Sequence, residues 1–394
     1  RAYLAHTLRA NRRDDALVHA YNVLSLAPAG GAAVRHLDEM LEGQVAVLSS
    51  GLLSSAETLE LLASLRRSRL YRADQHSYLL YPDRDLPGFL AKNTIPPERL
   101  AASALLTDLV AAGDTRVVVR DENGDAHFAG GFRNGKGVRR ALAQLAGEER
   151  WAAGVASDGE AVVALFEEIF DHASFTGRSG TFFAYEGLGS IYWHMVSKLQ
   201  LAVLETWRRA VDAGESPDVT TALAEAYYDV RAGLGFHKTP EAYGAFPTDP
   251  YSHTPAHAGA QQPGMTGQVK EDVLTRFGEL GVVVQEGRLG FAPGLLKREE
   301  LLARPVEASA LAIGGRQRLT LEPGGLAFTV CQVPVVYTLS DGPGRTHVTR
   351  SDGSVDVLEG STLDAATSRE VFDRSGQVTR IQVELPLSAL SPRA

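Results

Sequence analysis

Apolar residues recur at steps of three and four along most of the chain up to about residue 235. The stretches AAVRHLDEMLEGQVAVLSSGLL and SAETLELLASLRRSRL show this spacing, which predicts amphipathic helices with one apolar face. Ser54 and Ser55 followed by Glu57 predict the start of the second helix. Acidic residues in SDGEAVVALFEEIFDHAS predict another start near Ser157. The helices come in pairs, which favours an α/α toroid or a solenoid.

Alternating β-type runs take over toward the end of the chain. An Asn-Gly turn signal within residues 115–132 predicts one hairpin, and VVVQEGRLGF predicts another after a short helix near 268–279. From about residue 305, runs separated by Pro-Gly, Asp-Gly and Ser-Gly predict an antiparallel sandwich. We therefore expect a mainly α protein with a C-terminal β domain. Helical hairpins forming an α/α toroid would occupy residues 1–300, and an antiparallel β-sandwich would occupy residues 301–394.

The segment 236–267 has neither period and is dense in Pro, Gly, His and aromatic residues. Loops this long in a compact domain are usually functional or disordered, and four aromatic residues argue against disorder. We expect an active-site loop, although its polar side chains would also suit a loop that only satisfies its own backbone. Prolines exclude a regular helix here, so the histidines do not form the zinc pair of an H-E-x-x-H motif. No metal is expected. The candidate site residues of this segment are His237, Lys238, Asp249, Tyr251, His253 and His257.

The composition narrows the class of protein. Of 394 residues, 44% are hydrophobic and 22% charged, and no apolar run reaches the roughly 20 residues that span a bilayer. A net charge of -9 without a basic block favours a small substrate over nucleic acid. Cys331 is the only cysteine, which excludes an internal disulfide and favours the cytoplasm. The chain starts inside a helical pattern without a Met, so we expect a piece of a longer polypeptide.

The stretch YEGLGSIYWHMVSK, residues 185–198, combines ionisable and aromatic side chains. If it is one helix, its four-residue spacing forms a polar stripe, with aromatic rings beside it. Such a face would suit the wall of a sugar site. The alternative is an ordinary helix start with its aromatics in the core. The stripe consists of Glu186, Ser190, His194 and Lys198, and the aromatic residues are Tyr185, Tyr192 and Trp193.

Two further stretches carry amides and charges typical of sugar subsites. QQPGMTGQVKEDVLTR supplies Gln261, Gln262 and Glu271, although Glu271 and Asp272 would also be favoured at a helix N-terminus. YRADQHSYLLYPDR supplies Arg72 and Gln75, and it would equally suit an ion-paired surface loop.

The order of these parts resembles a known group of proteins. The helical body, the YEGLGSIYWHMVSK segment, the long loop and the terminal β domain with LEPGGLAFTVCQVPVVY are similar to the C-terminal half of large bacterial carbohydrate-active proteins. Those proteins are related to cellobiose phosphorylases and other (α/α)6-barrel glycosidases. The Arg-Asp-x-x-Gln-Asp type of acid motif of cellobiose phosphorylases is missing. No catalytic residue is therefore carried over.

This resemblance implies cleavage of an oligosaccharide with inversion, either by water or by phosphate. A protonated carboxyl group would donate to the leaving oxygen, and water would need a second carboxylate about 6.5 to 9.5 Å away. We expect Glu186 to be the acid because aromatic neighbours would raise its pKa. Asp249 and Glu271 are candidate bases. No cofactor is expected, although inorganic phosphate is a possible co-substrate. If phosphate is the nucleophile, cationic donors would replace the base. The candidate donors are Arg178, Lys238, His253 and His257.

Two other functions remain open at this point. A polysaccharide lyase would need a Tyr or His base and a cation for a uronate, for which Tyr251, His253 and Arg72 are candidates. A non-catalytic carbohydrate-binding or scaffold part of a larger enzyme would bind a glycan without turnover.

Overall fold

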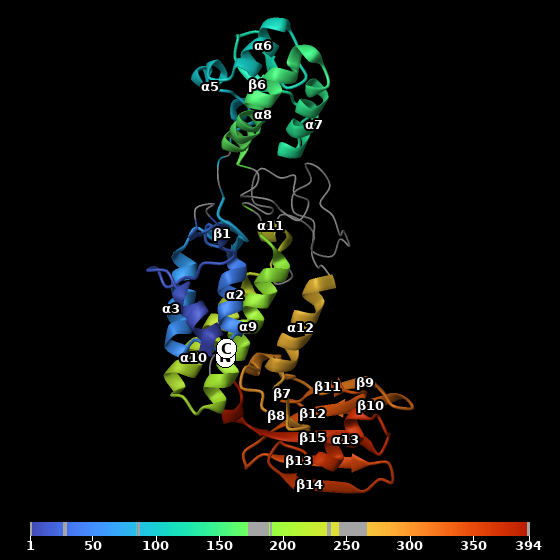
Figure 1. Ribbon diagram of the computed structural model, residues 1–394. Helices are drawn as coiled ribbons and strands as arrows, with labels where there is room; N and C mark the ends of the chain where they lie inside the picture. Colours follow the sequence, from blue (N-terminus) through green and yellow to red (C-terminus); the bar gives the residue numbers. More distant parts are fainter. Residues whose placement is uncertain are drawn as a thin grey trace. The chain divides into compact units, whose positions relative to one another are not determined.

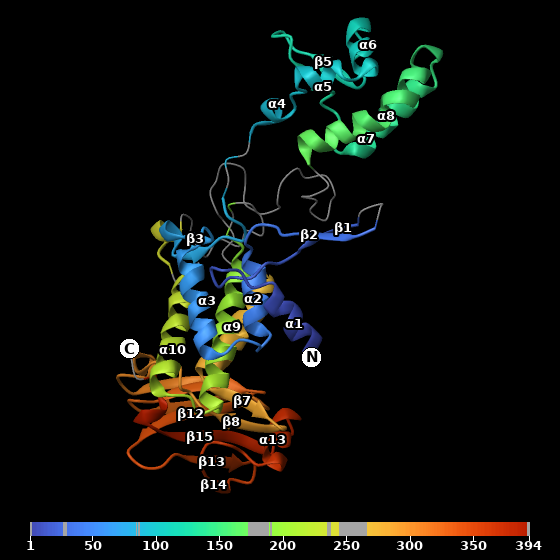
Figure 2. The same cartoon turned by 60° about the vertical axis from the view of Figure 1, so that its left-hand side comes forward.

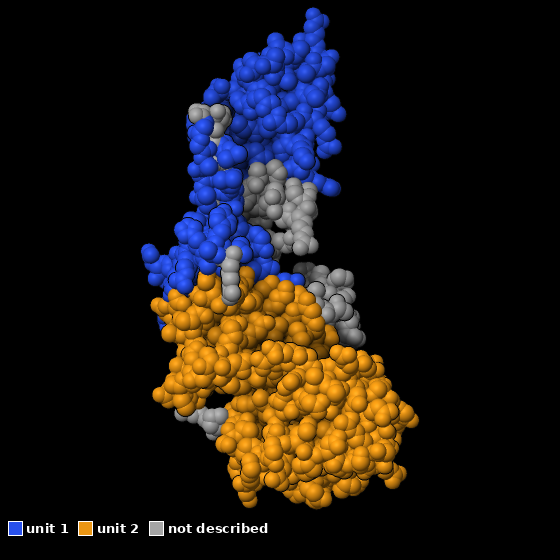
Figure 3. All heavy atoms as spheres, turned by 60° about the horizontal axis from the view of Figure 1, so that its bottom comes forward, with its two compact units in different colours: residues 1–44, 63–192 blue, residues 45–62, 193–394 orange. Residues whose placement is uncertain are grey.

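The computed structural model describes residues 2–26, 30–83, 85, 87–171, 189, 191–234, 238–243 and 266–391. The chain divides into two compact units, which Figure 3 distinguishes by colour. Unit 1 comprises Arg1–Gln44 and Ala63–Tyr192, and unit 2 comprises Val45–Leu62 and Trp193–Ala394. The predicted boundary near residue 300 stays a prediction.

Short elements form the beginning of the chain. The predicted start of the second helix is confirmed, because the Glu57 carboxylate accepts from the Ser54 N–H at 2.9 Å while Ser54 Oγ accepts from the Glu57 N–H. This reciprocal cap satisfies two backbone donors that the first turn leaves unpaired. The elements are α1 (Ala2–Ala10), β1 (Val23–Leu26), β2 (Ala32–Arg35), α2 (Leu41–Ser49), α3 (Ser55–Arg67), β3 (Tyr71–Arg72), η1 (Ala73–Gln75) and β4 (Ser77–Tyr78).

Residues 89–170 of unit 1 form a subdomain with its own apolar core, coloured cyan to green in Figure 1. Phe128, Trp151 and Phe166 are buried there among leucine and valine side chains. The hairpin predicted within 115–132 is confirmed, since β5 pairs antiparallel with β6 and Val118 lies opposite Phe128. The elements are α4 (Phe89–Lys92), α5 (Pro97–Ala101), α6 (Ala104–Ala112), β5 (Val118–Arg120), β6 (Ala126–Phe128), α7 (Gly135–Ala146) and α8 (Glu149–Phe170).

Helix α8 begins at Glu149, so the start predicted near Ser157 is wrong. The acidic signal there belongs to another helix. The Asp158 carboxylate accepts from the backbone N–H of Leu105 at 3.0 Å and from Ser103 Oγ at 2.9 Å, at the N-terminus of α6. Asp158 therefore caps a helix far away in the sequence, which local spacing does not reveal.

The helical part of unit 2 is built around α9 (Trp193–Asp212), α10 (Pro217–Ala232) and α12 (Thr266–Glu279). Helices α9 and α10 form a helical hairpin, and α12 packs on α9. The buried residues of α9 include Val196, Leu199, Val203, Trp207 and Ala210. Their spacing of three and four places them on one face, as the sequence pattern predicts. The short helix α11 covers Pro240–Tyr243.

Helix α12 carries polar side chains on its buried face. Glu271, Thr275 and Glu279 are 2–4% exposed, whereas Val269 and Val273 are about half exposed. The three buried residues follow at steps of four and so share one face. Burial of carboxylates requires partners, and those of Glu279 include two guanidinium groups, because Arg231 Nε and Arg276 Nη1 lie 2.8 and 2.7 Å from its oxygens.

The C-terminal part of unit 2 contains a five-stranded sheet in the order β11-β12-β15-β13-β14, and Figure 2 shows β12, β15, β13 and β14 following one another in that order. Successive inward residues of β15 are Ile381, Val383 and Leu385. The hairpin predicted from VVVQEGRLGF is confirmed as β7–β8, and Leu289 and Phe291 of β8 join the core of the sheet. The elements are β7 (Val282–Gln285), β8 (Arg288–Phe291), η4 (Arg298–Glu300), β9 (Val306–Ala312), β10 (Gly315–Leu321), β11 (Leu326–Val330), β12 (Val333–Ser340), β13 (Arg345–Arg350), β14 (Val355–Glu359), α13 (Ala365–Phe372), β15 (Val378–Pro386) and η5 (Leu387–Ala389).

The sheet is mixed, so the expectation of purely antiparallel strands is wrong. Strand β12 runs parallel to β15, with Tyr337 opposite Val383. A parallel pair requires a long crossover, and here β13, β14 and α13 form that connection. Turn signals indicate only hairpins between neighbouring strands, which is why the sequence misses it. On the opposite face of β12, Val336 packs against Leu319 and Leu321 of the β9–β10 hairpin.

The mainly helical body and the sheet-rich C-terminal part are both present. Within neither unit do the described helices close into a barrel, so the α/α toroid is not confirmed. A β-sandwich is not confirmed either, because one larger sheet is accompanied by the separate two-stranded sheets β9–β10 and β7–β8.

Candidate functional site

The helix expected over residues 185–198 begins only at Trp193. Gly189 has φ +66°, and Ile191 forms a β-bridge with Leu79, so neither continues a helix. A Cβ on Gly189 would lie 2.4 Å from Oδ1 of Asp83. The left-handed backbone and this close approach explain the glycine. The predicted continuous stripe is therefore wrong, although His194 and Lys198 do share a face of α9. Tyr185, Glu186 and Ser190 lie outside the described residues.

Trp193 opens α9 and is 7% exposed. The ammonium group of Lys238 lies 4.8 Å from the centre of the Trp193 ring, within the range of a cation–π contact. Lys238 precedes α11, so the long segment predicted as a site loop brings one cationic side chain to the beginning of α9. Tyr192, directly before Trp193, is half-buried.

His194 of α9 contacts Glu271 of α12 near the N-terminal ends of both helices. Nε2 of His194 lies 3.3 Å from Oε1 of Glu271, and Nζ of Lys270 lies 3.6 Å from the same oxygen. Glu271 is 3% exposed, and its Oε2 has no hydrogen-bond partner among the described residues. An imidazole, an ammonium group and a buried carboxylate thus meet at the surface of α12.

Asp272 adds a second carboxyl group beside Glu271. Burial, and to a lesser degree the neighbouring charge of Glu271, raises the pKa of Asp272 to about 6. Its Oδ1 has no hydrogen-bond partner in the described part of the chain. A carboxyl group with this pKa carries a proton in an appreciable fraction of molecules near neutrality, which suits proton donation.

Two contacts lie at the beginning of α9, that of Lys238 with Trp193 and that of His194 with Glu271, and Lys270 and Asp272 adjoin Glu271 in the chain. Lys238, His194 and Lys270 are donors suited to an anion or to sugar hydroxyls, and Glu271 and Asp272 are acceptors. Among the described residues, no group of three or more His, Cys, Asp or Glu side chains is placed to hold a metal ion. No helix in that same part of the chain is both long and apolar enough to cross a bilayer.

The other predicted residues lie in unit 1 or outside the described part of the chain. Arg72, which is in unit 1, pairs with Asp74 through Nε at 2.9 Å on an exposed turn, and Gln75 is half-buried in the same turn. This is the ion-paired surface loop that the sequence left open. Residues that lie outside the described part are Asp249, His237, Tyr251, His253, His257, Gln261, Gln262 and Arg178.

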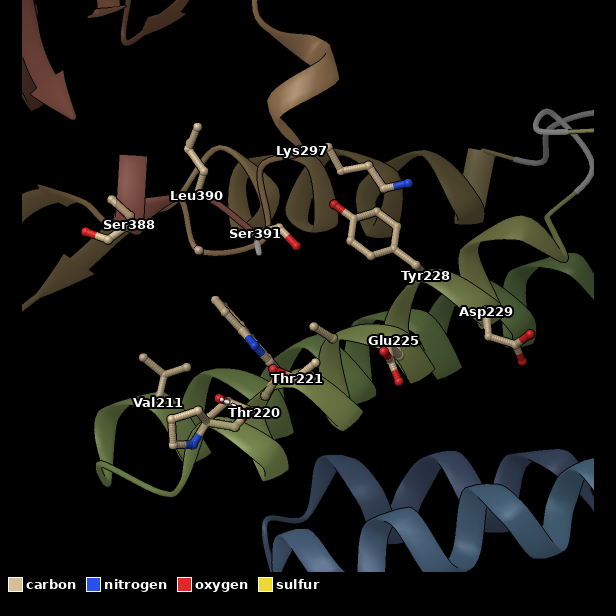
Figure 4. Close-up of a pocket in the computed structure, with 15 residues that line it drawn as sticks. Val211, Thr220, Thr221, Glu225, Tyr228, Asp229, Lys297, Ser388, Leu390 and Ser391 are labelled. Atoms are coloured by element: carbon tan, nitrogen blue, oxygen red, sulfur yellow. Dashed lines mark hydrogen bonds between the residues drawn. The ribbon is translucent and has the colours of Figure 1, made fainter. Parts of the chain in front are cut away.

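A separate cavity of about 560 Å³ lies in unit 2 between α10, the start of η4 and the C-terminal segment (Figure 4). Tyr228 extends from α10 toward Lys297, whose Nζ lies 4.5 Å from the Tyr228 ring centre. Trp207 lines this cavity and a second one of about 420 Å³. None of the residues predicted from the sequence lines either cavity. The size of a cavity alone does not assign a ligand, so the cluster around His194 remains the stronger site.

The sequence predicts Glu271 as a candidate base and leaves open that Glu271 and Asp272 are only charges favoured at a helix N-terminus. The structure places Glu271 inside the fold. A usable signal exists in the steps of four from Glu271 through Thr275 to Glu279, because a regular polar stripe can be the inward face of a helix. Which face of α12 is buried, the polar or the apolar one, can be decided only once the partner residues on α9 and α10 are known.

Comparison with known families adds one match. Residues 86–173 match the family model described as GH149 phosphorylase insertion domain 2, which is about a fifth of the chain. The match falls on the subdomain with its own core around Phe128 and Phe166. No curated protein matches the chain. The family match supports a relationship to glycoside phosphorylases.

Proposed function

We propose that this chain is part of an inverting glycoside phosphorylase that acts on an oligosaccharide. The match of residues 86–173 to a phosphorylase insertion domain carries the proposal. In the reaction, an oxygen of inorganic phosphate forms a bond to the anomeric carbon while the glycosidic C–O bond breaks. A carboxyl group gives its proton to the leaving oxygen, and the products are a sugar 1-phosphate and a shortened sugar.

The cluster at the start of α9 suits phosphate better than an activated water. Phosphate is itself the nucleophile, so no second carboxylate is required to deprotonate water. Cationic and hydrogen-bond donors must instead neutralise the anion, and Lys238 is such a donor. Glu271, the described candidate base, is already engaged by His194 and Lys270.

Two carboxyl groups are candidates for the proton donor. Glu186 remains the residue proposed from the sequence. Asp272 is the described alternative, because its raised pKa of about 6 keeps part of the population protonated. The lyase alternative stays open, because Arg72 is paired with Asp74 on an exposed turn and its other candidates, Tyr251 and His253, lie outside the described residues.

The decisive experiment is incubation of the chain with a panel of oligosaccharides, with and without inorganic phosphate. Phosphorus NMR should show a sugar 1-phosphate that forms only when phosphate is present. Sugar release without phosphate would indicate a hydrolase, and an ultraviolet-absorbing unsaturated product would indicate a lyase. Binding without any turnover would support the non-catalytic reading. Each of these three results would overturn the proposal.

Lys238→Met tests the assignment of the cluster. Loss of one cationic donor should raise the KM for phosphate by about tenfold or more with a smaller effect on kcat. Lys297→Met is the matched control, because Lys297 also lies over an aromatic ring, at 4.5 Å from Tyr228, but in the separate cavity. Equal effects of the two substitutions would exclude Lys238 as a phosphate-binding residue.

A further inference from the structure

Glu271 is placed to orient His194. Glu271 is a residue of α12 and is 3% exposed, while His194 is the second residue of α9, against which α12 packs. Oε1 of Glu271 lies 3.3 Å from Nε2 of His194. Both groups stand on regular helices, so their separation is fixed by backbone packing rather than by loop conformation.

The chemistry of this pair selects one form of the imidazole. An ionised carboxylate only accepts hydrogen bonds, so Nε2 of His194 must carry the hydrogen that it donates to Glu271. A neutral His194 is then the Nε2–H tautomer, with its lone pair on Nδ1. The partner of one ring nitrogen commonly sets the tautomer and the rotation of a functional histidine.

The same contacts argue against Glu271 as a base. A general base must reach the proton that it removes, but Oε1 of Glu271 is shared by His194 and Lys270 at 3.3 and 3.6 Å. Oε2 lies in the interior, with less than 1 Å² of accessible surface. Oε2 is therefore closed to a water from solvent, and Oε1 is already engaged by two donors.

We infer that Glu271 is a positioning residue, which fixes the tautomer and orientation of the His194 imidazole for contact with the reacting substrate. The inference rests on the proposed function only in the last respect, that His194 contacts the substrate. The tautomer itself is a property of the free protein.

The first test therefore needs no activity. Long-range proton–nitrogen NMR of the uniformly labelled chain reports the tautomer of each imidazole, and His194→Gln identifies the His194 signals by their loss. We expect the Nε2–H form in the unsubstituted chain. Glu271→Met, which removes the carboxylate but keeps most of the side-chain volume, should lower the fraction of the Nε2–H form. An unchanged Nε2–H form in Glu271→Met would overturn the inference.

Glu271→Gln separates positioning from base catalysis. The amide oxygen of Gln still accepts from Nε2 of His194, but an amide cannot take up a proton. A positioning role predicts a loss of phosphorolysis of tenfold or more for Glu271→Met and a smaller loss for Glu271→Gln. If Gln abolishes turnover as fully as Met while the tautomer persists, Glu271 is a base and the inference fails.

A double substitution covers the case in which Glu271→Met does not fold. Glu271→Gln combined with His194→Gln should lose no more activity than His194→Gln alone, because a positioning residue acts only through the group it positions. Additive losses would contradict the inference. If the chain shows no phosphorolysis with any glycan, the proposed function fails, and the NMR comparison still decides the role of Glu271.

Discussion

The phenol oxygen of Tyr227 lies 2.7 Å from Oε1 of Glu279 and joins α10 to α12 inside unit 2. Both side chains are buried, and Tyr227 also accepts a hydrogen bond from Nε2 of Gln200 on α9 at 2.8 Å. Burial and the charge of Glu279 raise the pKa of Tyr227, so the phenol stays protonated and donates. Three helices that carry or support the candidate site are thus held at one point.

Tyr227→Phe removes this connection without a large change in volume. The free energy of unfolding should fall by about 1–3 kcal/mol, because Gln200 and Glu279 lose a partner in the interior. Urea denaturation measures the change. Tyr228→Phe is the control, because the Tyr228 phenol donates to the carbonyl of Leu295 at a half-buried position. A loss for Tyr227→Phe no larger than for Tyr228→Phe would contradict the prediction.

Trp193→Ala tests whether the ring is part of the core or a platform for sugar. At 7% exposure, its loss should lower the free energy of unfolding by about 3–5 kcal/mol. Trp193→Phe should restore most of that stability, because it keeps an aromatic ring at the site. Reduced sugar affinity at an unchanged melting temperature would instead identify Trp193 as a binding platform.

Gly189→Ala should be destabilising for two reasons. Its φ of +66° is unfavourable for alanine and should cost about 1 kcal/mol or more, and the new Cβ would meet the Asp83 carboxylate. Thermal melts should show the loss, and Asp83→Ser should relieve its steric part. Gly130→Ala is the control, because open space surrounds Gly130 at an ordinary backbone conformation. Equal melting temperatures for both alanine variants would refute this account.

Asp158→Ala should weaken α6 of the residue 89–170 subdomain. Removal of the carboxylate that caps the helix costs about 0.5–2 kcal/mol, and hydrogen exchange of the α6 amides in the whole chain should accelerate accordingly. Glu160→Ala is the control on the same helix, because its side chain is 81% exposed and pairs only with Arg139 in the described structure. Unchanged exchange at Leu105 and Leu106 would speak against the cap.

Asp272→Asn should change stability in a pH-dependent way. The pKa of Asp272 is raised from 3.8 to about 6, so between about pH 4 and pH 6 the folded chain binds more protons than the unfolded chain. The free energy of unfolding therefore falls as pH rises through this window. Asn carries no charge, so above pH 6 the free energy of unfolding of the variant should be about 1 kcal/mol higher than that of the unsubstituted chain. This value is reduced for solvent screening, because the group is only half-buried.

Denaturation at pH 4 and pH 7.5 checks the sign of this effect. The advantage of Asp272→Asn should disappear at the lower pH, where both side chains are uncharged. A constant difference across the range, or a variant that is less stable at pH 7.5, would show that ionised Asp272 is well solvated or paired.

Local signals predicted the elements that depend on local chemistry. The cap of Ser54 by Glu57, the β5–β6 and β7–β8 hairpins and the apolar face of α9 all follow from residues within a few positions of one another. Helix capping and tight turns involve near neighbours, so the sequence contains their full cause.

Contacts between distant segments decided the rest. Asp158 caps a helix whose first residue is 54 positions earlier, and β12 pairs in parallel with β15 across a long crossover. The expected helix does not include Gly189, because the residue has a left-handed backbone conformation and lies close to Asp83. None of these partners is marked by spacing along the chain.

The sequence by itself determined that this protein has a helical body followed by a sheet-rich part, because helix and strand periods are local properties. It also contained the polar stripe of Glu271, Thr275 and Glu279 on α12. Only the tertiary structure decided that this stripe faces inward, while Val269 and Val273 remain exposed. The physical reason is that His194, Tyr227 and Arg231 meet those carboxylates from α9 and α10, and a buried carboxylate is stable only where such partners converge.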